Sequence, residues 1–169
     1  DFSWVAMGPT VTRWLADHGA TVVKIESPTR PDSLRTSPPF KNNEPGLDRS
    51  GFFTNYNCNK YGVTLDLNSP KGLEVARRLV KWADVVAESF VPGVIEKLGL
   101  GYDELRKIKS DIIMLSMSVE GRGGPRSNHP GFGNLIAALA GMSHLTGWPD
   151  REPGQPHGAY TDFVTPFFG

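Results

Sequence analysis

Short apolar runs alternate with amphipathic segments along the whole chain. The clearest run, Ile112-Ile113-Met114-Leu115, is apolar at every position. A continuous run of this kind is typical of a strand that is covered on both faces. The pattern predicts strands at 2–6, 21–26, 63–67, 85–88 and 112–118.

Helices are predicted between these strands. The segment 9–18 has a proline in its first turn and ends at Gly19. In the segment 69–83, apolar residues at helical spacing form one face, with Ser69 as the N-cap and Pro70 at the first helical position. Two shorter helices are predicted at 92–98 and 102–109.

The alternation of strands and helices favours an α/β fold with a doubly wound, Rossmann-like, mostly parallel sheet and helices on both faces. Ligands of such sheets bind beyond the carboxyl ends of the strands. The segment 27–60 breaks the alternation because it has no clear periodicity and is rich in proline, so we expect a long irregular loop there. Both ends look cut, which indicates a fragment of a longer protein.

Composition narrows the class of protein. The 18 basic and 18 acidic residues balance, so no general electrostatic attraction to nucleic acid or membrane is expected. Cys58 is the single cysteine, which suits a reducing, cytoplasmic compartment. No His/Cys grouping has zinc spacing, and we expect no metal site. Gly121-Arg122-Gly123-Gly124 is interpreted as a flexible loop, because no helix is predicted to open from it.

Three sequence blocks carry a family resemblance. They are 57–67, which contains Asn57-Cys58-Asn59-Lys60; 83–93, which contains Glu88-Ser89-Phe90-Val91-Pro92-Gly93; and 158–163, which contains Thr161-Asp162-Phe163. With further matching segments in the same order, they resemble the class III (CaiB/BaiF) CoA-transferases over essentially the whole chain. The resemblance implies that residues 1–169 are the N-terminal portion of the large Rossmann-like domain of a two-domain protein.

The resemblance also implies the reaction. Asp162 is the expected nucleophile, which attacks an acyl-CoA thioester and passes through an anhydride to an aspartyl-CoA thioester. We expect amides at the start of the helix carrying Asp162 to favour its ionised form. From the residues alone, Asp162 is an N-cap of that helix. The implied partners are acyl-CoA and a carboxylic acid, with coenzyme A as a substrate, no permanently bound cofactor, and an interlocked homodimer.

A CoA-binding set follows from the same resemblance. Its residues are Asn57, Asn59, Lys60, Leu65, Glu88, Ser89 and Pro92. The alternative is that the asparagines fix turns and that Lys60 is solvated. The family often has asparagine where this chain has Ser89, whose hydroxyl can still form a hydrogen bond.

Departures from the family pattern bear on the type of reaction. Ala6 stands where some relatives carry a glutamine that supports acyl intermediates. Related α-methylacyl-CoA racemases use a histidine that aligns at Phe132, and a phenylalanine cannot move a proton. Transfer therefore ranks above racemisation, with His129 as the residue that keeps a racemase possible. A further alternative is a non-catalytic CoA-binding or dimer-forming fragment.

Overall fold

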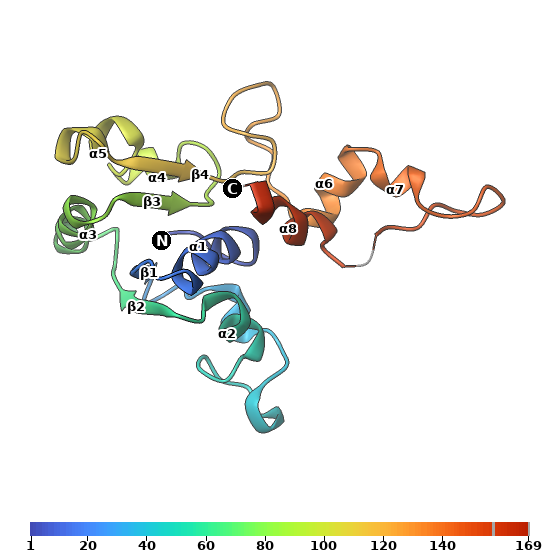
Figure 1. Ribbon diagram of the computed structural model, residues 1–169, viewed down its shortest axis with the longest axis horizontal. Helices are drawn as coiled ribbons and strands as arrows, with labels where there is room; N and C mark the ends of the chain where they lie inside the picture. The colour runs from blue at the N-terminus through green and yellow to red at the C-terminus, as the bar shows by residue number, and fades with distance from the viewer. Residues whose placement is uncertain (157, 169) are drawn as a thin grey trace.

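The computed structural model describes residues 1–156 and 158–168, and it has a mixed α/β architecture (Figure 1). Its strands form two parallel pairs. β1 (Val22–Glu26) pairs with β2 (Lys60–Thr64), and β3 (Val85–Glu88) pairs with β4 (Ile113–Ser116). The parallel direction agrees with the prediction from strand-helix alternation.

Residues 1–3 lie between the two strand pairs (Figure 1). The Asp1 nitrogen donates to the Val23 carbonyl and the Asp1 carbonyl accepts from the Ile25 nitrogen, both at 2.9 Å. On the other side, the Phe2 nitrogen donates to the Ala87 carbonyl at 2.7 Å. Backbone hydrogen bonding is thus continuous from β1 to β3.

The prediction of a strand at 2–6 is wrong, because these residues do not form a regular strand. Residue Val5 has a φ of 65°, which turns the chain away from the extended direction. Helix α1 (Met7–Asp17) then begins directly, earlier than the predicted start at Pro9.

The other predicted helices are confirmed, with slightly shorter bounds. They are α3 (Pro70–Trp82), α4 (Val94–Lys97) and α5 (Tyr102–Ile108). The Ser69 hydroxyl accepts a hydrogen bond from the Gly72 nitrogen at 3.0 Å, as an N-cap does. Buried residues of α3, including Ala76 and Val80, pack into the main core beside β3.

The segment 27–60 is more ordered than predicted. It contains two 3₁₀ helices (Ser33–Thr36 and Lys41–Asn43) and helix α2 (Gly51–Asn57), which Ser50 caps through the Phe53 nitrogen. Strand β2 begins at Lys60 rather than at residue 63. The prediction missed these elements because two turns or fewer are too short to show a hydrophobic period.

The regular elements of the C-terminal part are short helices, which lie to one side of the strands (Figure 1). They are α6 (Gly133–Leu139), α7 (Met142–Leu145), α8 (Tyr160–Val164) and a 3₁₀ turn (Thr165–Phe168). Helices α6 and α8 contact each other. No helix within the described ranges is long and apolar enough to cross a membrane.

Replacing the N-cap of α3 tests the local basis of that helix. Ser69→Ala removes the acceptor of the Gly72 amide, so we expect the free energy of unfolding to fall by about 1 kcal/mol. Urea denaturation measures the change. Ser110→Ala, at an exposed turn residue, is the control and should change the free energy by less than about 0.5 kcal/mol. Equal stability of the Ser69 variant and the wild type would contradict the capping role.

Candidate active site

Asp162 is the third residue of α8, and its backbone nitrogen donates to the Ala159 carbonyl at 2.9 Å. The N-cap of this helix is Ala159, so the alternative that Asp162 is the cap is wrong. The Asp162 side chain instead lines a pocket of about 140 Å³.

This pocket lies at the carboxyl ends of β3 and β4, where the fold prediction places a ligand. Ser89 directly follows β3 and Met117 directly follows β4. The remaining wall is formed by the turn into α1 and by the start of α6. The lining residues are Trp4, Val5, Ala6, Met7, Gly8, Ser89, Met117, Val119, Gly131, Phe132, Ile136 and Asp162. A carboxylate and a hydroxyl therefore face mainly apolar walls.

Asp162 approaches the backbone of α6 closely at Gly133. A Cβ atom on Gly133 would lie 2.8 Å from both Cγ and Oδ1 of Asp162, and 2.9 Å from Oγ1 of Thr161. The Thr161 hydroxyl donates to the Gly133 carbonyl at 2.8 Å. Two consecutive residues of α8 thus meet one buried glycine of α6.

Burial raises the pKa of Asp162 above its ordinary value of 3.8, and the Gly133 backbone amide opposes this shift only in part. We expected amides of the helix that carries Asp162 to favour the ionised form. Desolvation outweighs the stabilisation of the ionised form, and the amide identified as favouring the carboxylate is that of Gly133 in α6. A contribution from the amides of α8 stays a prediction.

Two of the predicted site residues lie at the end of β3. The Ser89 hydroxyl accepts from the Trp4 nitrogen at 2.8 Å, which fixes the pocket wall at residue 4 to β3. The Glu88 side chain is fully buried. One of its oxygens accepts from the Phe90 nitrogen and the other from Arg122 Nη1, both at 2.8 Å. Glu88 therefore anchors a neighbouring loop, and Ser89 faces the pocket.

Arg122 is a residue that sequence reasoning missed. It lies in the glycine-rich segment for which the sequence predicts a flexible loop, yet it forms ion pairs with Glu88 and with Glu96 of α4. The sequence feature that could have indicated this role is a single arginine within a glycine run that follows a predicted strand. An unpaired glutamate at the end of the adjacent strand requires a cation once it is buried.

Lys60 is buried rather than solvated, with 2% of its side chain exposed. Its Nζ lies 3.1 Å from Asp1 Oδ2, 2.8 Å from the Pro9 carbonyl and 3.1 Å from Asn57 Oδ1. Burial lowers the pKa of Lys60 to about 7. Lys60 and Asn57 thus attach the start of β2 to α1.

The remaining predicted residues lie elsewhere. Asn59 has a φ of 61° and donates to Asp17 Oδ1 at 2.6 Å, so it does fix a turn. Leu65 packs against the main core, and Pro92 precedes α4. Of the predicted set, the structure brings Ser89 and Asp162 into one pocket. Contact of the others with CoA stays a prediction.

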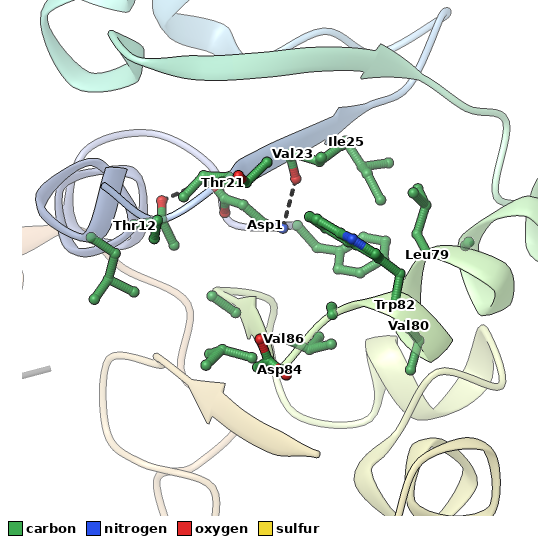
Figure 2. Close-up of a pocket in the computed structure, with 18 residues that line it drawn as sticks. Asp1, Thr12, Thr21, Val23, Ile25, Leu79, Val80, Trp82, Asp84 and Val86 are labelled. Carbon is green, nitrogen blue, oxygen red and sulfur yellow. Dashed lines mark hydrogen bonds between the residues drawn. The ribbon is translucent and has the colours of Figure 1, made fainter. Parts of the chain in front are cut away.

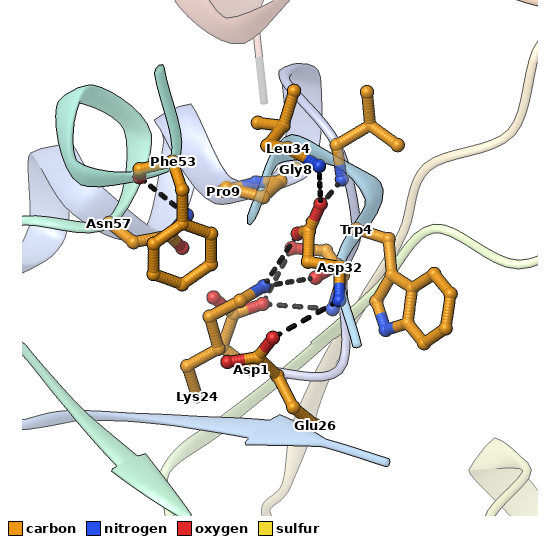
Figure 3. Close-up of polar contacts among 12 residues, drawn as sticks. Asp1, Trp4, Gly8, Pro9, Lys24, Glu26, Asp32, Leu34, Phe53 and Asn57 are labelled. Carbon is orange, nitrogen blue, oxygen red and sulfur yellow. Dashed lines mark hydrogen bonds and ion pairs between the residues drawn. The ribbon is translucent and has the colours of Figure 1, made fainter. Parts of the chain in front are cut away.

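A buried ion pair lies behind the pocket wall (Figure 3). Lys24 Nζ is 3.2 Å from Asp32 Oδ2 and donates to the Ser3 carbonyl at 2.8 Å. The two side chains are 2% and 0% exposed. Asp32 also accepts from the Val5 nitrogen at 3.2 Å and from the Leu34 nitrogen at 3.0 Å. The pair therefore holds the unusual left-handed backbone of Val5, a residue that lines the pocket.

A larger cavity, of about 320 Å³, lies near the opposite ends of the strands (Figure 2). Its walls include Thr21 and Val23 of the β1 region, Leu79 and Trp82 of α3, and Val86 of β3. These walls are mostly apolar and lie at the amino ends of the strands, away from Asp162. Within residues 1–156 and 158–168, no cluster of three or more His, Cys, Asp or Glu side chains could hold a metal ion.

Comparison with known proteins identifies the class to which this fold and pocket belong. The family model described as CoA-transferase family III matches residues 1–169. A crystal structure of a CaiB/BaiF family protein from Brucella suis superimposes with a TM-score of 0.89 at 36% identity, over 99% of this chain and 44% of that chain. The chain therefore belongs to CoA-transferase family III, which confirms the resemblance.

Curated relatives have related names. Succinyl-CoA:glutarate CoA-transferase of Mus musculus is 36% identical over 169 residues, which are 99% of this chain and 38% of that protein. Acetyl-CoA:oxalate CoA-transferase of Acetobacter aceti is 36% identical over 153 residues, 90% of this chain and 38% of that protein. The chain thus spans well under half the length of these relatives.

Breaking the buried ion pair tests its structural importance. Lys24→Met leaves the Asp32 carboxylate buried without its cation, so we expect the free energy of unfolding to fall by about 3–5 kcal/mol. Urea denaturation gives the change. Lys107→Met is the matched control, because Lys107 pairs with Glu104 at the exposed surface and should cost less than about 1 kcal/mol. Similar losses for the two variants would show that burial of the pair has no special effect.

Proposed function

We propose that the protein containing this chain transfers CoA between an acyl-CoA donor and a carboxylic acid acceptor, with Asp162 as the nucleophile. The observation that carries the proposal is the position of the Asp162 carboxylate. It is half-buried in a mainly apolar pocket at the carboxyl ends of β3 and β4. Membership of CoA-transferase family III and the names of the relatives support the same reaction class.

The proposed chemistry balances without any added reactant. The Asp162 carboxylate attacks the thioester carbonyl, the carbon–sulfur bond breaks, and a mixed anhydride and CoA thiolate form. The thiolate attacks the aspartyl carbonyl and releases the first acid as a carboxylate, which leaves an aspartyl-CoA thioester. The acceptor carboxylate then reverses these two steps, which releases the new acyl-CoA and regenerates Asp162.

The pocket suits this sequence of steps. An anhydride is readily hydrolysed, and walls formed by Val5, Met117 and Ile136 limit the access of water to it. Burial also raises the pKa of Asp162, so its carboxylate is less stabilised by solvent and more basic than an exposed one. The first effect protects the anhydride from hydrolysis, and the second makes the carboxylate a stronger nucleophile toward the thioester.

Ser89 is the best placed of the CoA-binding residues expected from the resemblance, because it lines the pocket with Asp162. We propose that the other expected residues also belong to the CoA-binding region. Their main contribution there is to hold neighbouring elements in place. They are Asn57, Asn59, Lys60, Leu65, Glu88 and Pro92. We further propose that residues 1–169 belong to a doubly wound, Rossmann-like large domain and that the whole protein is a cytoplasmic, interlocked homodimer.

The pocket walls favour transfer over racemisation. Racemisation requires two groups on opposite sides of the α-carbon that each move a proton. Phe132 lies in the wall, whereas His129 does not line the pocket. Assay of acid-to-acid CoA exchange separates the transferase from a non-catalytic CoA-binding or dimer-forming fragment, and exchange of the α-proton with deuterated water would reveal a racemase.

Replacement and trapping of the nucleophile test the proposal in the full-length protein. Asp162→Asn cannot form the anhydride, so we expect transfer to fall by at least about a thousandfold while acyl-CoA still binds. After incubation with acyl-CoA, hydroxylamine should modify residue 162 in the wild type and leave the variant unmodified.

The exposed Asp150 provides the matched control. Asp150→Asn should transfer CoA at the wild-type rate and be modified at Asp162. Near-normal turnover by the Asp162 variant, or modification of a different carboxylate, would refute the assignment of the nucleophile.

The pH dependence follows from the raised pKa of Asp162. Attack requires the ionised form, so the transfer rate should rise with pH along a limb whose midpoint lies above 3.8. The folded protein also holds this proton to higher pH than the unfolded chain does. The stability of the wild type relative to Asp162→Asn should therefore be greatest below pH 3.8 and decline as pH rises through the folded pKa. Pairs of urea titrations across this range measure the decline, and a difference independent of pH would contradict it.

A further inference from the structure

We infer that Gly133 and Thr161 are positioning residues that set where the Asp162 carboxylate points, Gly133 by leaving room for it and Thr161 by fixing α8 to α6. This inference rests on the proposed role of Asp162 and deepens it. Neither residue is among the catalytic or CoA-binding residues expected from the family resemblance. Both are identified by the contact between α6 and α8.

The space for the carboxylate exists because residue 133 has no side chain. A Cβ atom there would lie 2.8 Å from Cγ and Oδ1 of Asp162, well inside van der Waals contact. Asp162 would have to move, since the helical backbone of α6 cannot yield easily. The same displacement would take the carboxylate away from the Gly133 amide, which favours its ionised form.

Apolar burial alone does not hold α8 at this place. The helix has 5 residues, and none of them is in the buried class. A helix this short is not stable by itself. The Phe163 ring of α8 faces the Tyr56 ring at a centroid distance of 6.5 Å, and the 3₁₀ turn after α8 packs on α1 through Phe167 and Trp14 at 4.6 Å. Neither contact involves Thr161 or Asp162.

The Thr161 hydroxyl supplies a constraint at the start of α8. It donates to the Gly133 carbonyl at 2.8 Å from the residue directly before Asp162. One hydrogen bond from the residue before the nucleophile therefore ties α8 to the glycine that makes room for the Asp162 side chain. Loss of the hydroxyl would allow α8 to rotate, and the carboxylate would leave its place beside Gly133.

The first variant is Gly133→Ala in the full-length protein. The atoms that a Cβ on Gly133 would meet belong to the side chains of Asp162 and Thr161, which lie outside the main hydrophobic core, so the variant should remain folded, and urea denaturation checks this. We expect kcat to fall at least tenfold with little change in KM for acyl-CoA. Gly62→Ala is the matched control, because a Cβ atom on Gly62 meets nothing within 4 Å, and its kcat should equal that of the wild type.

A second pair of variants isolates the hydroxyl. Thr161→Val has nearly the shape of threonine but cannot donate, and we expect its kcat to fall about tenfold. Thr161→Ser keeps the donor and should restore at least half of the wild-type kcat. A merely structural role would affect both variants in proportion to their stability, which urea denaturation measures in parallel.

Titration of Asp162 gives a readout that does not require activity. The side-chain carboxyl ¹³C signal of Asp162 is assigned by its absence in Asp162→Asn, and NMR follows it with pH. Thr161→Val should move the midpoint upward, because the carboxylate loses the Gly133 amide, whereas Thr161→Ser should match the wild type.

These measurements separate the two hypotheses. If the wild type transfers no CoA but the midpoints shift as expected, the proposed function fails and the positioning role stands. If the wild type transfers CoA while Gly133→Ala and Thr161→Val keep its kcat and its midpoint, the positioning role is overturned.

Discussion

The ion pair between Lys24 and Asp32 is the interaction on which much of the structure depends. A charged lysine within a central strand is costly to bury, and Asp32 compensates it from the loop that follows β1. The same carboxylate accepts from the amide of Val5 and so holds a β-branched residue at a φ of 65°. That turn ends the segment between β1 and β3 and starts α1 beside the pocket. Strand, loop and pocket wall therefore share one electrostatic anchor.

Charged residues at strand ends serve a similar purpose on the other side of the pocket. Glu88 is fully buried at the end of β3 and is neutralised by Arg122 from the loop after β4. Ser89, the next residue, holds the backbone of Trp4. Polar side chains at the carboxyl ends of the strands thus hold the neighbouring loops in place. Of the predicted site residues, Asp162 and Ser89 line the pocket.

The features that could be predicted from the sequence are those that depend on residues close together in the chain. Helix α3 and the apolar run of β4 were predictable because capping and periodicity are local properties. The position of Asp162 in a pocket followed from family resemblance rather than from the residues alone. The Lys24–Asp32 pair, the role of Arg122 and the fit of Asp162 against Gly133 were not predictable, since each joins segments whose approach no local pattern encodes. Helix α2 was missed because seven residues give too little periodicity.

The pocket joins the two extremes of the chain, since Trp4 to Gly8 face Asp162 across it. The helices that carry Gly133 and Asp162 lie outside the main hydrophobic core, which is formed by residues up to 114. Opening of α6 and α8 can therefore occur as a local unfolding event while the strands and α3 remain intact. A protein of this design can lose the pocket around Asp162 and still give the spectrum of a folded molecule, so the overall fold and the integrity of the pocket must be measured separately.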